Sequence, residues 1–295
     1  MAAKIEVPEQ LKHELPQTKW GRILGITPIV MTVIATMLAG LASSEMTKAQ
    51  YDRSLAAQIQ SKAGDQWSFY QAKKLRSTVA HNTLDLLAAI SDVAPLASSS
   101  LPGADPATVA ALTKDQLPAA PAAQLPADVQ AALELVENSR PESDIAAALA
   151  RVKPATLAQA LADLQNAATA YDVATKSINQ AVDTFDETLM TGDRNIFRGF
   201  SAARLRYTAS RYDAESRLNL AVAGIYELQV RLGNESAERH HVRSGKFFYG
   251  MLAAQMAVII STFAIAARKR NFLWSMAAAA GSAAVAFAVY VYLYV

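Results

Sequence analysis

The sequence predicts an all-α integral membrane protein with three transmembrane helices and a long, coiled-coil-like helical domain in water. The first observation behind this prediction is three apolar stretches with no charge in the middle, at residues 23–42, 247–267 and 272–295. A bilayer core needs about 20 apolar residues in helical form, and a helix satisfies its own backbone there. The second observation is the helical spacing of apolar residues within the water-soluble segment 43–246.

Composition excludes several classes of function. The formal net charge of +2 gives no strongly basic surface, so we expect no nucleic-acid partner. The chain has no cysteine, which excludes disulfides, thiolate catalysis, cysteine-bound zinc and iron–sulfur clusters. It also has no glycine-rich phosphate loop, nucleophile elbow or catalytic carboxylate pair. We therefore expect no enzymatic activity, no cofactor and no metal.

The elements are expected in a simple order. No proline interrupts residues 43–91, so a single helix can continue from the first apolar stretch to residue 91. Six prolines between 95 and 126 then mark loops and a semi-rigid linker. The expected order is an N-terminal segment 1–22, a transmembrane helix 23–42, a long soluble helix 43–92, a Pro/Ala-rich insertion 93–200 with short helices near 107–112, 127–137 and 142–152 and a heptad helix 155–190, a return helix 201–246, a transmembrane helix 247–267, a basic loop 268–271 and a transmembrane helix 272–295.

The heptad helix carries a regular apolar seam. Spacings of four and three alternate along it, which is the pattern of a coiled coil. Two interpretations stay open: the helix packs inside a small bundle of its own chain, or the seam joins subunits. In the second case the candidate interface residues are Ile178, Val182, Phe185 and Leu189.

An aromatic and basic motif stands in the long soluble helix. Trp67 and Tyr70 are three residues apart and share a helix face, as do Gln66 and Lys73 over two turns. Large amphipathic aromatics beside charges are typical of helix–helix contacts and protein interfaces. Packing is the preferred interpretation over a ligand site, and the candidate interface residues are Gln66, Trp67, Tyr70, Lys73 and Arg76.

A second motif, Arg239-His240-His241, precedes the second apolar stretch. Adjacent histidines on a helix point about 100° apart, so they are poor joint ligands for one metal. We expect these three residues to lie at the membrane interface, against lipid headgroups or a partner helix.

The predicted orientation depends on the short basic loop. Arg268, Lys269 and Arg270 should be cytoplasmic, with Trp274 at the interface, because basic residues in short loops prefer the cytoplasm. Three crossings then place residues 1–22 in the cytoplasm and the soluble domain in the periplasm. Basic residues before the second span count against this, but long domains translocate largely regardless of charge. Since the segment before the first apolar stretch is long and of mixed charge, that stretch is interpreted as an uncleaved anchor.

Small residues recur in the apolar stretches. Ala35 and Ala39 have the spacing that lets membrane helices approach closely, and the third stretch has similar alanine faces. Gln255 is the one notable polar residue, so no proton or transport path is expected.

Both motifs resemble those of an uncharacterised bacterial membrane-protein family, the domain of unknown function forty-three thirty-seven family. The first, Asp-Gln-Trp-x-x-Tyr-Gln-Ala-Lys, spans residues 65–73, and Arg-His-His at 239–241 precedes a terminal hairpin with a basic loop. The resemblance covers about 20–87 and 205–295 and leaves out about 93–200. The family has no assigned activity, so the resemblance implies a bacterial, membrane-bound, helical protein and no more.

Two functional hypotheses follow. The first is a non-enzymatic scaffold of the bacterial inner membrane, a homo-oligomer held by the heptad seam and by small-residue transmembrane contacts. The second is an accessory or sensory subunit that docks on a separate membrane complex through its helical domain.

Overall fold

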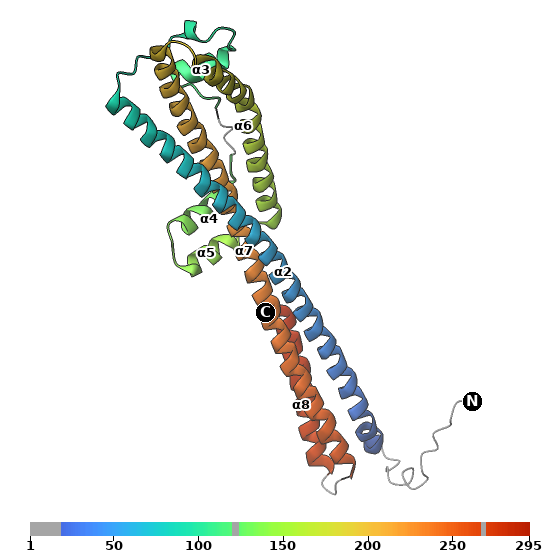
Figure 1. Ribbon diagram of the computed structural model, residues 1–295. Helices are drawn as coiled ribbons and strands as arrows, with labels where there is room; N and C mark the ends of the chain where they lie inside the picture. The colour runs from blue at the N-terminus through green and yellow to red at the C-terminus, as the bar shows by residue number, and fades with distance from the viewer. Residues whose placement is uncertain (1–18, 120–123, 267–269) are drawn as a thin grey trace, which may run out of the picture. The chain divides into compact units, whose positions relative to one another are not determined.

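The computed structural model describes residues 19–119, 124–266 and 270–295, and every regular element within them is a helix. The all-α prediction is confirmed. Most of the predicted N-terminal segment, together with Arg268 and Lys269, lies outside the described residues. The helices (Figure 1) are α2 (Lys19–Ile90), the 3₁₀ helix η1 (Ser98–Ser100), α3 (Pro106–Lys114), α4 (Ala127–Glu137), α5 (Glu142–Leu149), α6 (Pro154–Leu189), α7 (Arg194–Ala266) and α8 (Arg270–Tyr294).

Three helices, α2, α7 and α8, each contain a stretch long and apolar enough to cross a membrane. This confirms the three predicted spans in their length and composition. Helices α2 and α7 are 72 and 73 residues long and continue without a break beyond their apolar stretches. The chain divides into two compact units, one made of the chain up to Leu55 and from Gly233 onward, the other of Ala56–Leu232.

The first unit contains the three apolar stretches, and its described part is a three-helix bundle. The Ser244 hydroxyl of α7 donates to the Ala42 carbonyl of α2 over 2.7 Å. Trp274 of α8 donates its ring N–H to Thr27 Oγ1 of α2 over 3.1 Å. A buried cluster joins the three helices, and most of its members are small: Ala35, Leu38, Ala42, Phe247, Ala254, Ala284 and Val291.

Buried small residues recur at every seventh position along these helices. A seven-residue repeat keeps one seam facing a partner helix, and small side chains let two backbones approach closely. The members of the repeat are Ala35, Ala42, Ala49, Ala56 and Ala63 in α2, Ala202, Ala209, Ser216 and Ala223 and then Ala237 and Ser244 in α7, and Ala277 and Ala284 in α8.

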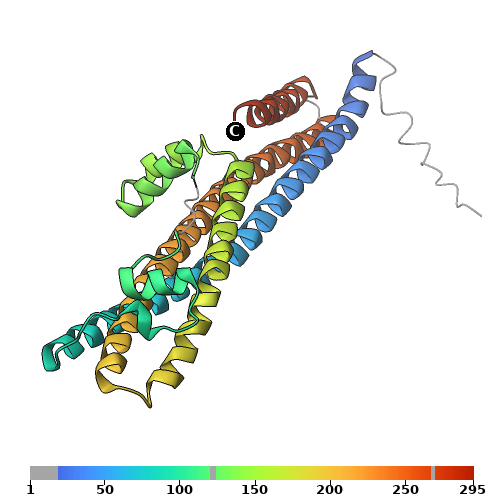
Figure 2. The same cartoon turned by 90° about the horizontal axis from the view of Figure 1, so that it is seen from above.

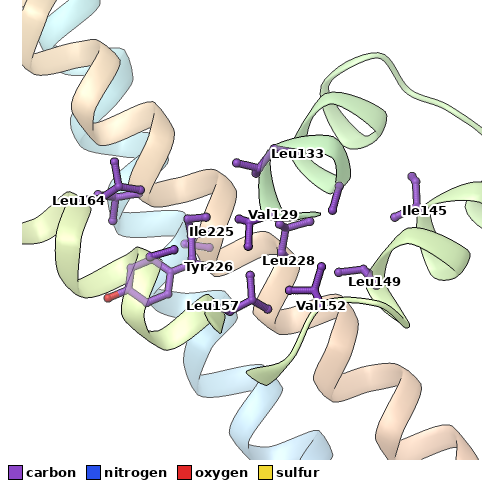
Figure 3. Close-up of a cluster of buried hydrophobic side chains, with 14 residues drawn as sticks. Val129, Leu133, Ile145, Leu149, Val152, Leu157, Leu164, Ile225, Tyr226 and Leu228 are labelled. Carbon is purple, nitrogen blue, oxygen red and sulfur yellow. The ribbon is translucent and has the colours of Figure 1, made fainter. Parts of the chain in front are cut away.

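The second unit packs α6 and the short helices onto its parts of α2 and α7. Figures 1 and 2 both show α6 alongside α7. One core gathers aliphatic side chains from α4, α5, α6 and α7, with Ala63 of α2 (Figure 3). A second core contains residues of α3 and Leu101, which follows η1. They pack against Ile178 of α6 and against Phe200 and Tyr207 of α7.

The heptad seam of α6 lies inside this unit. Ile178 is fully buried, and Val182 and Phe185 are buried with it against Phe200 and Tyr207 of the same chain. Leu189, at the end of the seam, is half-buried. Of the two interpretations, the structure therefore favours packing within the chain, because the seam's large side chains already have their contacts there.

Candidate functional site

The aromatic and basic motif of α2 meets an acidic residue of α7 in the second unit. Lys73 forms an ion pair with Glu215, whose residue is only 6% exposed. Arg211, one turn earlier on α7, places its Nε 3.7 Å from the other carboxylate oxygen. Glu215 is thus held between two cations, which a buried carboxylate requires.

The ring of Tyr212 lies among the same cations. The Arg211 guanidinium stands 4.4 Å from the ring centroid, Lys73 Nζ 5.2 Å and the Arg76 guanidinium 5.6 Å. Cations over a tyrosine face are attracted by its quadrupole. Lys73 and Arg76 therefore fasten α2 to α7 through Glu215 and Tyr212.

The remaining motif residues also serve packing. Trp67 and Tyr70 are half-buried and meet edge to face, with their centroids 5.7 Å apart. Gln66 is half-buried as well. Next to them, Lys74 pairs with Asp213 over 2.7 Å, and this hydrogen bond holds the pKa of Asp213 below its usual value. The motif therefore mainly holds α2 against α7. We call the contacts of Lys73 and Arg76 with Glu215 and Tyr212 the clasp.

Two tyrosines lie buried close to the clasp. Tyr207 donates its hydroxyl to Asn179 Oδ1 over 2.7 Å, whereas the Tyr171 hydroxyl is buried with no hydrogen-bond partner among the described residues. Burial raises the pKa of Tyr171 to about 12 and raises the pKa of Tyr207 as well. Both side chains stay neutral phenols at physiological pH.

The outward side of α2 bears an apolar stripe in the second unit. Phe69, Leu75, Val79, Leu86 and Ile90 are each between 53% and 73% exposed. Four of the five recur at helical spacings, and Ala72 and Thr83 lie between them at spacings of three and four. Five of the eight large apolar side chains that are exposed among the described residues of the second unit belong to this stripe. The sequence contains these apolar positions but does not show that they are exposed.

The first unit holds a second ion-pair cluster, where α2 and α7 leave their apolar stretches. His240 Nδ1 lies 2.6 Å from Glu45 Oε2, and Lys48 Nζ lies 2.7 Å from the other oxygen. Asp52 is 4.0 Å from His240 Nε2. Burial opposes ionisation of Glu45, but the hydrogen bonds from Lys48 and His240 outweigh it and hold its pKa below the usual value.

The other predicted interface residues have separate places. Arg239 and His241 are exposed, so the Arg-His-His motif contributes one residue to the ion-pair cluster and leaves two on the surface. Trp274 contacts Thr27 in the apolar bundle. The side chain of Arg270, like Arg268 and Lys269, lies outside what the structure describes. Sequence reasoning did not identify Glu45, although it is the first acidic residue after the first apolar stretch.

Within the described ranges, no three histidine or acidic side chains are grouped as a metal would need. Comparisons with known proteins add no relative: no family model, curated protein or solved structure matches the chain. The family resemblance of the two motifs stays a prediction.

Proposed function

We propose that this chain is a non-enzymatic accessory subunit of the bacterial inner membrane, anchored by three transmembrane helices, whose helical domain docks on another membrane complex. The observation that carries this proposal is the exposed apolar stripe of α2, from Phe69 to Ile90. Exposed apolar patches on otherwise well-packed domains mark interaction sites.

The stripe is suited to receive a helix of another protein. Its apolar residues extend over about six turns of α2, roughly 30 Å at 1.5 Å per residue. Apolar positions at spacings of three and four are what a helix in a groove or a two-helix seam uses. The clasp at Glu215 supports the docking proposal, because it holds this part of α2 against α7 while the stripe faces outward.

A site-specific photocrosslinker at Val79 tests the docking face in intact cells. We expect a crosslink to one defined membrane protein. The matched control is His81, which is also exposed but points to the opposite side of α2, about 200° away. Equal crosslinking at both positions, or none at Val79, would contradict docking through the stripe.

For the orientation we propose a cytoplasmic N-terminus and a periplasmic domain, supported by the short basic loop 268–271 and by three crossings. A reporter that is active only outside the cytoplasm should be active when fused after Val295. Activity of a cytoplasm-only reporter at that position would invert the orientation.

The self-associating scaffold stays a second candidate, but its predicted surface needs revision. The α6 seam is occupied within the chain, and so are Ala35, Ala277 and Ala284 of the small-residue faces. A groove between α2 and α7 in the apolar bundle still favours contact between copies.

A further inference from the structure

A groove extends along the apolar bundle between α2 and α7. One part of the groove is lined by small and polar residues of α2 and by one face of α7: Thr32, Ala35, Thr36, Ala39, Gln255, Val258 and Ile259. A neighbouring hollow continues from Ala39 to Met46, and His241 lines its far part. No residue of α8 is among the described residues that line either part, so the third helix leaves this face of the bundle uncovered.

Gln255 is out of place on this face. It lies near the middle of the apolar stretch 247–267 and its side chain is exposed, without a hydrogen bond to any described residue. An amide in hydrocarbon without a partner is costly, and water and headgroups are absent at that depth. The hydroxyls of Thr32 and Thr36 already donate to backbone carbonyls one turn earlier, over 2.8 and 2.9 Å.

We propose that a second copy of this chain packs against this groove and that the two Gln255 side chains hydrogen-bond to each other. A primary amide carries both a donor and an acceptor, so it is its own complement when a twofold axis brings two copies together. Ala39, which is half-buried, keeps the wall of the groove low and lets a helix of the second copy approach closely. An acyl chain would fill the groove but would leave the amide unpaired, which makes lipid alone the poorer occupant.

This pairing rests on the membrane placement proposed above and is independent of the α2 stripe. It also gives the scaffold hypothesis a contact surface that the chain does not use internally. A foreign transmembrane helix with a polar residue at the same depth is the competing occupant, and the experiment must separate the two.

Because the chain has no cysteine, single cysteines report the contact directly. Ile259→Cys places a thiol in the groove one turn from Gln255, and Met256→Cys places one on the exposed side outside the groove. Full-length protein in native membranes is oxidised, with two differently tagged copies co-expressed. We expect a disulfide-linked dimer from Ile259→Cys, at least about fivefold more than from Met256→Cys.

The second variant removes the amide. Adding Gln255→Leu to Ile259→Cys should reduce the dimer about fivefold, the size expected for one intramembrane hydrogen bond of roughly 1 kcal/mol. Absence of a dimer at Ile259→Cys, including linkage to another protein only, would overturn the proposal. Equal dimer from both cysteines, or a dimer that Gln255→Leu leaves unchanged, would overturn it too. Crosslinking at Val79 should persist in the Gln255→Leu variant, so failure here is distinguishable from failure of the docking function.

Discussion

The same two helices pack by different means in the two units of this chain. In the apolar unit, α2, α7 and α8 meet through alanine, glycine and serine, and its few large buried apolar side chains are Leu38, Phe247 and Val291. In the other unit, α6 and the short helices add large buried side chains, among them Tyr171, Tyr207 and Phe200. Small residues at every seventh position in α2 and α7 are common to both.

This difference is what the proposed membrane placement of the apolar unit predicts. In water, burial of large apolar side chains is favourable by about 25 cal/mol per Å², so a third helix with leucine, tyrosine and phenylalanine adds stability. In lipid that driving force between helices is absent, and close backbone contact takes its place. A charge or a cavity should therefore be most damaging in the second unit, and added bulk should be damaging where small residues meet.

The largest expected effect is Ile178→Asp in the core of the second unit. Ile178 is fully buried, so an unpaired carboxylate there should cost about 4 kcal/mol or more and unfold the unit. The matched control is Val173→Asp on the same helix, at a position that is 68% exposed, and it should change little. Limited proteolysis and circular dichroism of the full chain in mild detergent check both. If the Ile178→Asp protein stays folded but changes from an oligomer to a monomer, the seam is an interface between subunits.

Lys73→Met tests the clasp that fastens α2 to α7. Loss of this cation leaves Glu215 buried with Arg211 alone, so we expect destabilisation of about 2 to 3 kcal/mol. Arg53→Met is the comparison in the other unit, where the Arg53–Glu238 pair is more than half exposed on both sides. It should have little or no effect. Urea unfolding measures the free energy of unfolding of both variants. Equal decreases would show that the buried pair stabilises the fold no more than the exposed pair does.

Added bulk separates the packing modes within the apolar unit. Ala277→Leu inserts a large side chain at a fully buried position of α8, and overpacking of this kind costs about 2 kcal/mol. Ala279→Leu, two residues on, faces outward and should be tolerated. Thermal unfolding in detergent reports the difference. Tolerance of both substitutions would show that α8 is not closely packed.

The smallest expected effect concerns the two buried tyrosines. Tyr171→Phe removes a hydroxyl with no hydrogen bond, so it should leave the protein equally stable or more stable by up to about 1 kcal/mol. Tyr207→Phe removes the hydrogen bond to Asn179 and should cost about 1 kcal/mol. Urea unfolding at neutral pH should thus show a lower free energy of unfolding for Tyr207→Phe and no decrease for Tyr171→Phe. Equal decreases in the two variants would contradict the structure.

The Tyr171 phenol also predicts a pH dependence. Its pKa is raised from 10.0 in the unfolded chain to about 12 in the fold, so its contribution to stability is complete below pH 10 and is lost as pH rises toward 12. In Tyr171→Phe the loss of stability between pH 10 and 12 should be smaller. Some loss should remain, because the pKa of Tyr207 is raised as well. An unchanged alkaline profile in the variant would contradict burial of Tyr171.

The sequence predicts the architecture well because its strongest signals are local. The three apolar stretches and the long proline-free run to residue 91 are decided by length and composition. The partner of each helix is not local information. A seam such as the one containing Ile178 reads the same whether its own chain or a second copy covers it, and only the packing of Phe200 and Tyr207 against it decides.

The candidate site was predicted in part. The sequence singles out Lys73 and Arg76, but the residues that they contact, Glu215 and Tyr212, lie more than a hundred residues away and carry no motif of their own. The seven-residue repeat of alanines in α2, matched by one in α7, is a sequence signal for close helix packing, but it does not identify the partner of either helix. The apolar stripe could not be recognised as exposed until the opposite side of α2 was known to be covered.

Pairing of α2 with α7 inside one chain is the central claim, and proximity of Lys74 to Asp213 tests it most directly. Lys74→Cys and Asp213→Cys, combined in the otherwise cysteine-free chain, are treated with a short thiol-reactive crosslinker in native membranes. Two differently tagged copies are co-expressed, and each single variant serves as control. We predict a crosslink within single chains, seen as a shifted band at monomer mass, with no linkage between the two tags. Crosslinks that join the two tags, with none inside a chain, would show that the long helices pair between copies and would contradict this account.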